Sequence, residues 1–199
     1  MTYKYDTNFF AEIDTELKAY LLGVFYSRGS GRIQTSLSDF SILYLIKSSL
    51  SYSGPVRIYG DSAELHISQK HFISQLFSLG CVPSKQNDSL FPLHLSSLLP
   101  HFLCGVFDSY GQITIAKGKY LNISLVYNEL FIYGLREYLK TNLGVSTKHS
   151  YTSLSTNTIK MMITNSRHAK LFLSWVYADY SSCQSRNLLK YQEFLQNGV

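Results

Sequence analysis

The chain has 199 residues, of which 45% are hydrophobic and only 16% are charged, where about 25% is usual. These values indicate a globular chain with a real core and exclude a disordered one. The net charge of +5 is compatible with a nucleic-acid partner and equally with a slightly basic protein of another kind.

The first 82 residues predict three helices with three short strands between them. Apolar residues recur at helical spacing after Glu16, up to the glycines at 29 and 31. Alternating residues after Arg32 predict a half-buried strand, and two short strands flank the turn at Gly60-Asp61. The predicted elements are a helix at 16–29, a strand at 32–37, a helix at 39–50, a hairpin at 56–67 and a helix at 70–79.

The second half predicts the same order of elements. A Pro-rich polar stretch at 83–97 is the predicted linker between a first module at 12–82 and a second at 98–199. Ten residues separate Gly29 from Asp39, so the leading hairpin of the first module is predicted to be truncated. The predicted elements of the second module are helices at 98–109 and 128–142, hairpins at 112–126 and 146–164, and helices from 167 and at 184–196.

Neither a membrane segment nor a metal site is predicted. The chain begins without the apolar stretch of a signal peptide, and no apolar run reaches ~18–20 residues, so we expect a soluble intracellular protein. The cysteines at 81, 104 and 183 form no CxxC pair, and nothing suggests a disulfide scaffold. We therefore expect no metal and no cofactor.

A near-repeat is the most informative feature of the sequence. Leu-Leu-Gly-Val-Phe-Tyr-Ser-Arg-Gly at 21–29 returns as Leu-Cys-Gly-Val-Phe-Asp-Ser-Tyr-Gly at 103–111, with six of nine positions identical. Gly23 and Gly105 fall inside predicted helices, where a glycine costs ~1 kcal/mol relative to alanine. Close approach of two helix backbones would offset that cost, so we predict that these glycines form a helix–helix interface.

The two segments resemble the paired motifs of LAGLIDADG homing endonucleases in their two-motif, single-chain form. The resemblance covers roughly residues 12–196 and includes Ile13–Tyr20, His101–Leu103 and Leu188–Phe194. It implies an α+β fold of two pseudo-symmetric αββαββα modules whose sheets sit in the major groove of DNA. It also implies that the protein cuts both strands of the DNA with the help of divalent metal ions. An acid at the eighth position of each motif would hold these ions.

The sequence departs from that pattern at the positions that hold the metals. The eighth positions are Arg28 and Tyr110, and neither a permanent cation nor a phenol with a pKa near 10 is a suitable ligand for Mg²⁺. Asp108, at the sixth position, is expected to make a polar contact near the helix end. Arg28 either binds DNA phosphates where a metal would sit or faces solvent and neighbouring acids.

Polar residues of the predicted strands are the candidates for nucleic-acid contact, because Arg, Lys, Gln and Asn pair with base edges or phosphates. Solvent-facing strand residues are polar in any case, so each position is weak evidence by itself. Together with Arg28, the candidates are Arg32, Gln34, Ser36, Arg57, Gln112, Thr114, Lys117, Lys119, Asn122, Lys148, Tyr151 and Lys160.

The leading hypothesis is a monomeric, catalytically inactive LAGLIDADG-type protein that binds double-stranded DNA without cleaving it. One alternative is a structural or interaction subunit of a ribonucleoprotein or transcription assembly. Another is an RNA-binding, splicing-type factor that uses its many tyrosines for base stacking. A working endonuclease with relocated ligands would need Asp108, the one acid near the helix junction.

Overall fold

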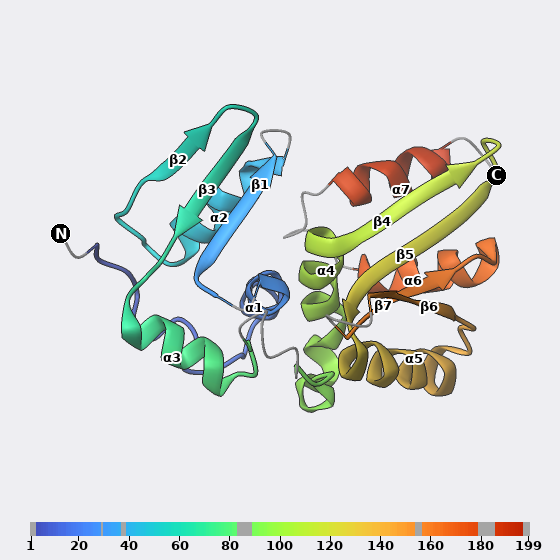
Figure 1. The fold of residues 1–199 in the computed structure, drawn as a ribbon, viewed down its shortest axis with the longest axis horizontal. Helices are drawn as coiled ribbons and strands as arrows, with labels where there is room; N and C mark the ends of the chain where they lie inside the picture. Colours follow the sequence, from blue (N-terminus) through green and yellow to red (C-terminus); the bar gives the residue numbers. More distant parts are fainter. Residues whose placement is uncertain are drawn as a thin grey trace.

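The computed structural model describes residues 3–28, 30–36, 39–82, 89–153, 157–178 and 186–196, without the side chains of Ser27, Arg28 and Ser153. Two antiparallel sheets lie on either side of a central pair of helices, α1 and α4 (Figure 1). Buried apolar residues from both halves form one continuous core. Within the described residues, no helix is long and apolar enough to cross a membrane.

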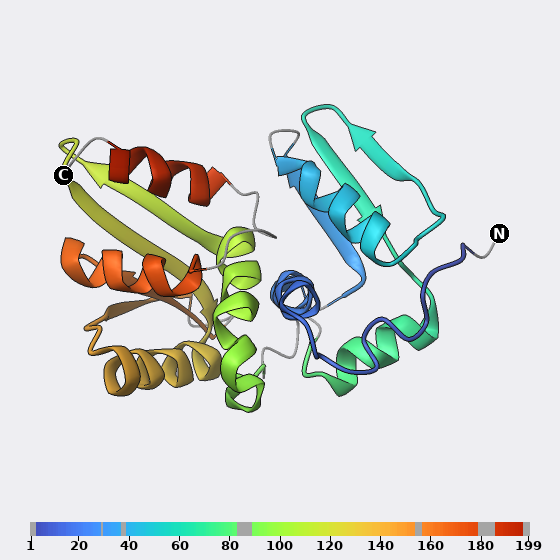
Figure 2. The same cartoon turned by 180° about the vertical axis from the view of Figure 1, so that it is seen from behind.

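The first half contains a three-stranded sheet in the order β1-β3-β2. Its leading hairpin is reduced to the single strand β1, which pairs directly with β3, so the predicted truncation is confirmed. Helix α2 lies behind this sheet, as the view from the back shows (Figure 2). The elements are α1 (Glu16–Arg28), β1 (Arg32–Ser36), α2 (Ser41–Ser49), β2 (Val56–Tyr59), β3 (Ser62–His66) and α3 (Lys70–Ser78).

The second half contains the full four-stranded sheet, in the order β4-β5-β7-β6. Helix α5 begins where the Asn128 side chain accepts a hydrogen bond from the Phe131 amide (2.9 Å), and it ends at Gly144 with φ 62°. The elements are α4 (Leu99–Tyr110), β4 (Gly111–Ala116), β5 (Tyr120–Asn128), α5 (Glu129–Leu143), β6 (Lys148–Ser153), β7 (Thr158–Ile163), α6 (Ser166–Val176) and α7 (Arg186–Gln196).

The segment between the two sheets differs in part from the expected linker. Of the stretch predicted over 83–97, the structure describes residues from Ser89 onward, and Leu93–Leu98 form a short 3-10 helix before α4. Cys104 is disulfide-bonded, which the spacing of the cysteines in the sequence did not suggest. Cys81 is a free, buried cysteine.

Candidate nucleic-acid interface

The two repeated helices touch at their glycines. A Cβ atom on Gly23 would overlap the carbonyl oxygen of Phe102, and one on Gly105 would overlap that of Tyr20. The same added atoms would lie 3.0 Å from the Val106 amide nitrogen and 2.9 Å from that of Val24. Because backbone atoms of the facing helix occupy these positions, any side chain at either glycine would push α1 and α4 apart.

Asp108 lies near the end of α4 and receives hydrogen bonds from two tyrosines. The Tyr20 hydroxyl donates to Oδ2 (3.1 Å), and the Tyr177 hydroxyl donates to Oδ1 (2.7 Å). Both tyrosines are buried, so their hydroxyls need a protein acceptor. This agrees with the polar role predicted for Asp108, although the sequence did not reveal the two partners.

The eighth motif positions are the last residues of their helices, Arg28 in α1 and Tyr110 in α4. The Arg28 side chain lies outside the described part of the structure. The partly exposed Tyr110 ring meets the ring of Tyr127 edge-on, with centroids 6.1 Å apart. The Tyr127 hydroxyl in turn donates to the carbonyl oxygen of Tyr26 (2.6 Å) and so ties β5 to α1.

Three tyrosines in this region predict a loss of stability at alkaline pH. Burial raises the pKa of Tyr20, Tyr26 and Tyr127 above the usual 10. Above pH 10 these groups would ionise in the unfolded chain while they remain protonated in the folded one, so unfolding is favoured as pH rises. Burial also raises the pKa of the Cys81 thiol above its usual value of 9. We therefore expect the free energy of unfolding to change little between pH 7 and 8 and to fall from about pH 9 upward.

Urea unfolding followed by circular dichroism between pH 7 and 11 checks this expectation. Absorbance at 295 nm should show that the buried tyrosines ionise together with unfolding. Unchanged stability up to pH 11 would contradict the prediction.

The second sheet collects five of the predicted contact residues on one face. In the strand register, Gln112 is opposite Ser124 and Thr114 is opposite Asn122. Lys160 is opposite Val126 and Ser150, and Lys148 is opposite Met162. Alternate residues of a strand point to the same side, so these residues share one face, called here the outer face. The other face is apolar and buried by α5 and α6, through Ile113, Ile123, Leu125, Ile159, Met161 and Ile163.

Lys117 and Lys119 lie at the tip of the hairpin that joins β4 to β5. Lys117 has φ 52° and Gly118 has φ 71°, which are the left-handed conformations of a tight hairpin turn. Both lysines are exposed, and the Lys119 ammonium lies 5.3 Å from the centre of the Tyr120 ring.

Tyr151 does not belong to the outer face, so its prediction as a contact residue was wrong. It is opposite Ile159, a buried residue of the helix-covered side. Its hydroxyl donates to Glu129 Oε1 (3.1 Å) and shares a hydrogen bond with the Tyr133 hydroxyl (3.2 Å), both on α5. These two contacts raise the pKa of Tyr151 to about 12.

The first sheet also has an outer face, and an acid lies in its middle. Arg32, Gln34 and Ser36 are alternate residues of β1 and therefore point to this face. Arg57 of β2 lies opposite Glu64 of β3. The guanidinium of Arg32 contacts Glu64 Oε2 through Nε (2.7 Å) and Nη2 (2.6 Å). Gln34 donates to the Ser62 hydroxyl (3.3 Å). Glu64 was not among the sequence candidates, because the sequence carries no local signal that β3 pairs with β1.

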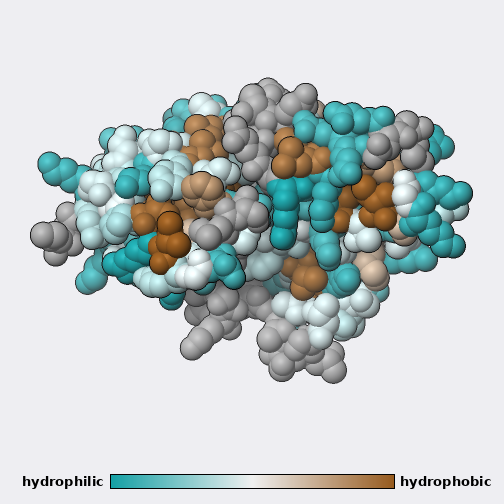
Figure 3. Space-filling view, turned by 90° about the horizontal axis from the view of Figure 1, so that it is seen from above, coloured by the Kyte–Doolittle hydropathy of each residue, from teal (hydrophilic) through white to brown (hydrophobic). Residues whose placement is uncertain are grey.

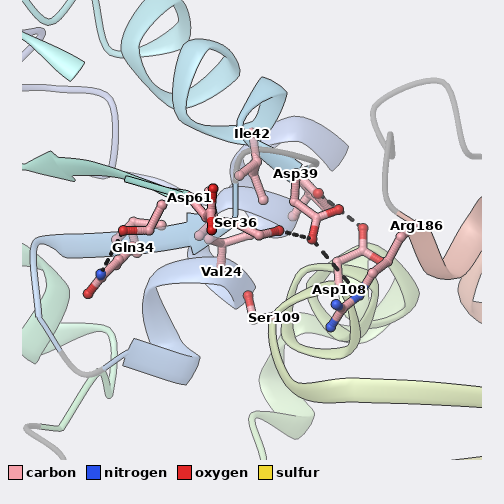
Figure 4. Close-up of a pocket in the computed structure, with 13 residues that line it drawn as sticks. Val24, Gln34, Ser36, Asp39, Ile42, Asp61, Asp108, Ser109 and Arg186 are labelled. Carbon is pink, nitrogen blue, oxygen red and sulfur yellow. Dashed lines mark hydrogen bonds and ion pairs between the residues drawn. The ribbon is translucent and has the colours of Figure 1, made fainter. Parts of the chain in front are cut away.

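A pocket of about 560 Å³ lies between the halves, next to β1 and the end of α4. Figure 4 shows three charged side chains converging there: Asp39 from the segment before α2, Asp108 from α4 and Arg186 from α7. Arg186 Nε lies 3.9 Å from Asp39 Oδ2, which also accepts a hydrogen bond from Ser36 (3.1 Å). Asp39 and Arg186 were not predicted as site residues from the sequence, because neither spacing nor motif connects them with Asp108.

The fold can be compared with solved structures. The I-LtrWI LAGLIDADG homing endonuclease bound to target DNA matches with a TM-score of 0.65 and 12% identity, over 91% of this chain and 89% of that chain. The chain has a LAGLIDADG endonuclease-like fold. The meganuclease I-SmaMI bound to uncleaveable DNA matches with a TM-score of 0.61 and 10% identity, over 92% of this chain and 90% of the other.

A third LAGLIDADG structure, the N-terminal LAGLIDADG domain of DUF199/WhiA, has a TM-score of 0.53 and 18% identity, over 94% of this chain and 93% of that chain. No family model matches the sequence, and no curated protein matches it. At these identities the likeness establishes the LAGLIDADG-like fold and not the chemistry of this chain.

The residues at the motif ends do not fit the metal ions that the resemblance implies. Hard divalent cations take carboxylate and carbonyl oxygens, whereas the two terminal positions supply a guanidinium and a phenol. Asp108, the nearby acid, has both oxygens engaged by tyrosine hydroxyls. Within the described residues, no group of three or more His, Cys, Asp or Glu side chains could hold a metal.

Proposed function

We propose that this protein binds double-stranded DNA through the outer faces of its sheets and does not cut it. The observation that carries the proposal is the shared face of Gln112, Thr114, Asn122, Lys148 and Lys160, set by the strand register. Amide side chains read base edges and lysines neutralise phosphates, so this face offers both kinds of contact. The DNA-bound structures with the same fold support the choice of partner.

The residue types at the motif ends support the absence of cleavage. Arg28 and Tyr110 end the helices at the positions where the resemblance implies acids. A cation at Arg28 repels a divalent metal and attracts phosphate, so it favours binding over hydrolysis. The proposal includes a monomer with modules at 12–82 and 98–199.

A binding and cleavage assay tests this function. We expect genomic DNA fragments to bind equally well in EDTA and in Mg²⁺, with an affinity that falls steeply as salt rises. The fragments should stay intact after incubation with Mg²⁺ or Mn²⁺. Cleavage would overturn the non-enzymatic part, and a lack of salt-dependent binding would overturn the function.

RNA is a second candidate partner because of two exposed tyrosines on the outer faces. Tyr59 is 53% exposed and Tyr120 is 48% exposed, and each could stack on an unpaired base. A pool of single-stranded RNA run in parallel with the DNA distinguishes the two. Tighter, tyrosine-dependent binding to RNA would favour the splicing-type alternative.

A role as a subunit of an assembly rests on different residues. Leu189 and Leu195 on α7 are 66% and 50% exposed, and exposed apolar side chains can dock a partner. In the view from above, however, the apolar residues form separate groups among hydrophilic ones and no single large patch (Figure 3). That face therefore offers a protein partner no single large apolar surface.

A further inference from the structure

We propose that the two sheets contribute unequally to DNA binding. The second sheet makes the phosphate contacts, whereas in the first sheet Glu64 neutralises the arginines that could make them. This inference rests on the proposed function and concerns how the same surface is used.

The second sheet presents positive charge without a counter-charge. Lys148 and Lys160 lie on its outer face, and Lys117 and Lys119 lie at the adjoining hairpin tip. The described strand residues that share this face carry no acid; they include Gln112, Thr114, Asn122, Ser124, Ser150 and Met162. Four cations therefore face solvent with polar, base-reading side chains among them.

The first sheet presents about as many acids as bases. Its two cations, Arg32 and Arg57, are balanced by Glu64 on the same face and Asp61 at the adjoining turn. The Glu64 side chain is only 5% exposed, whereas that of Arg32 is 60% exposed. Two guanidinium nitrogens of Arg32 contact one oxygen of this acid, at 2.7 and 2.6 Å.

Moving Arg32 onto a DNA phosphate would leave Glu64 buried without its partner. A buried carboxylate that loses its counter-charge is strongly unfavourable, so the ion pair competes directly with DNA for Arg32. Glu64 would also repel any phosphate that approached Arg57, which is directly opposite it in the register.

The truncated hairpin adds to this difference. The second sheet extends beyond the core through β4 and β5 and the turn that carries two lysines. In the first sheet β1 has five residues and pairs directly with β3, so no equivalent basic hairpin is present among the described residues. The first sheet thus has fewer groups that can reach a DNA backbone.

Paired substitutions test whether the two sheets contribute unequally to DNA binding. The measured quantities are the DNA affinity and its dependence on salt. We expect Lys148→Ala with Lys160→Ala to weaken binding about tenfold or more at 0.1 M salt and to flatten the slope of log K against log salt by about 1.8. Arg32→Ala with Arg57→Ala should weaken binding clearly less than the lysine pair does and change the slope less. Thermal unfolding establishes that this variant is folded, because it leaves Glu64 without Arg32. Lys140→Ala with Lys190→Ala removes the same charge from exposed helix positions and serves as the control.

Glu64→Gln gives the complementary test. It should release Arg32, tighten binding by about threefold to tenfold and steepen the slope by about 0.9. Thermal unfolding establishes that the variant is folded, and adding Arg32→Ala to it should cancel the gain.

Two results would overturn the inference: an arginine pair as costly as the lysine pair, or a folded Glu64→Gln variant that binds no more tightly. If the unaltered protein shows no salt-dependent binding to DNA, the proposed function itself fails. In that case none of the variants changes DNA affinity or its salt dependence. Hydroxyl-radical footprinting should show protection on one side of the site's centre.

Discussion

Gly105→Val is expected to abolish folding, and Gly105→Ala to lower the free energy of unfolding by about 3 kcal/mol or more. The added Cβ overlaps the Tyr20 carbonyl oxygen and lies 2.9 Å from the Val24 nitrogen, so no side-chain movement relieves the clash. Since small proteins are stable by only about 5–15 kcal/mol, separating α1 from α4 removes much of the total. Urea unfolding monitored by circular dichroism measures the loss.

Gly144→Ala is the matched control for this experiment. Nothing lies within 4 Å of a Cβ at Gly144, and its φ of 62° is the only strain that an alanine would meet there. That strain costs about 1–2 kcal/mol. If Gly105→Ala were no more harmful than Gly144→Ala, the helices would not be in backbone contact.

Asp108→Ala is expected to lower the free energy of unfolding by about 2–5 kcal/mol, because it leaves the buried hydroxyls of Tyr20 and Tyr177 without this acceptor. Asp108→Asn keeps one acceptor oxygen and should cost less. DNA affinity should be unchanged for the folded fraction of both variants, since the carboxylate acts on the fold.

A double-mutant cycle separates this structural role from a metal-binding one. In the Asp108→Ala background, Tyr20→Phe should restore part of the stability, because it removes a hydroxyl that has lost its partner. A stable Asp108→Ala protein that had lost a metal-dependent cleavage activity would instead support a working endonuclease with relocated ligands.

The order of elements could be predicted from the sequence because periodicity and turn residues agree along most of the chain. Gly144 ends α5 in the left-handed conformation, and the hairpin turns fall at Gly60-Asp61 and Gly118, as their residue types predict. The single strand after α1 followed from the ten residues available there. Alternation along β4 likewise placed Gln112 and Thr114 on one face.

Contacts between distant strands and helices could not be predicted in the same way. The Arg32–Glu64 ion pair depends on β1 lying beside β3, and two residues 32 positions apart carry no local signal of that pairing. Tyr151 was misplaced for a different reason: it comes three residues after Lys148 in a regular stretch of β6, so alternation puts the two side chains on opposite faces, and choosing both as contact residues ignored this. The tyrosine partners of Asp108 come from α1 and from the residue after α6.

Strand β2 is the outer edge of the three-stranded sheet, and this position has a consequence for how copies of the protein meet. Its exposed residues Ile58 (63%) and Tyr59 (53%) would favour strand pairing between molecules in a crowded solution. Arg57 precedes them and Pro55 comes just before the strand. A charge on the strand and a proline beside it both disfavour such pairing, so we expect Arg57 and Pro55 to limit self-association through this edge.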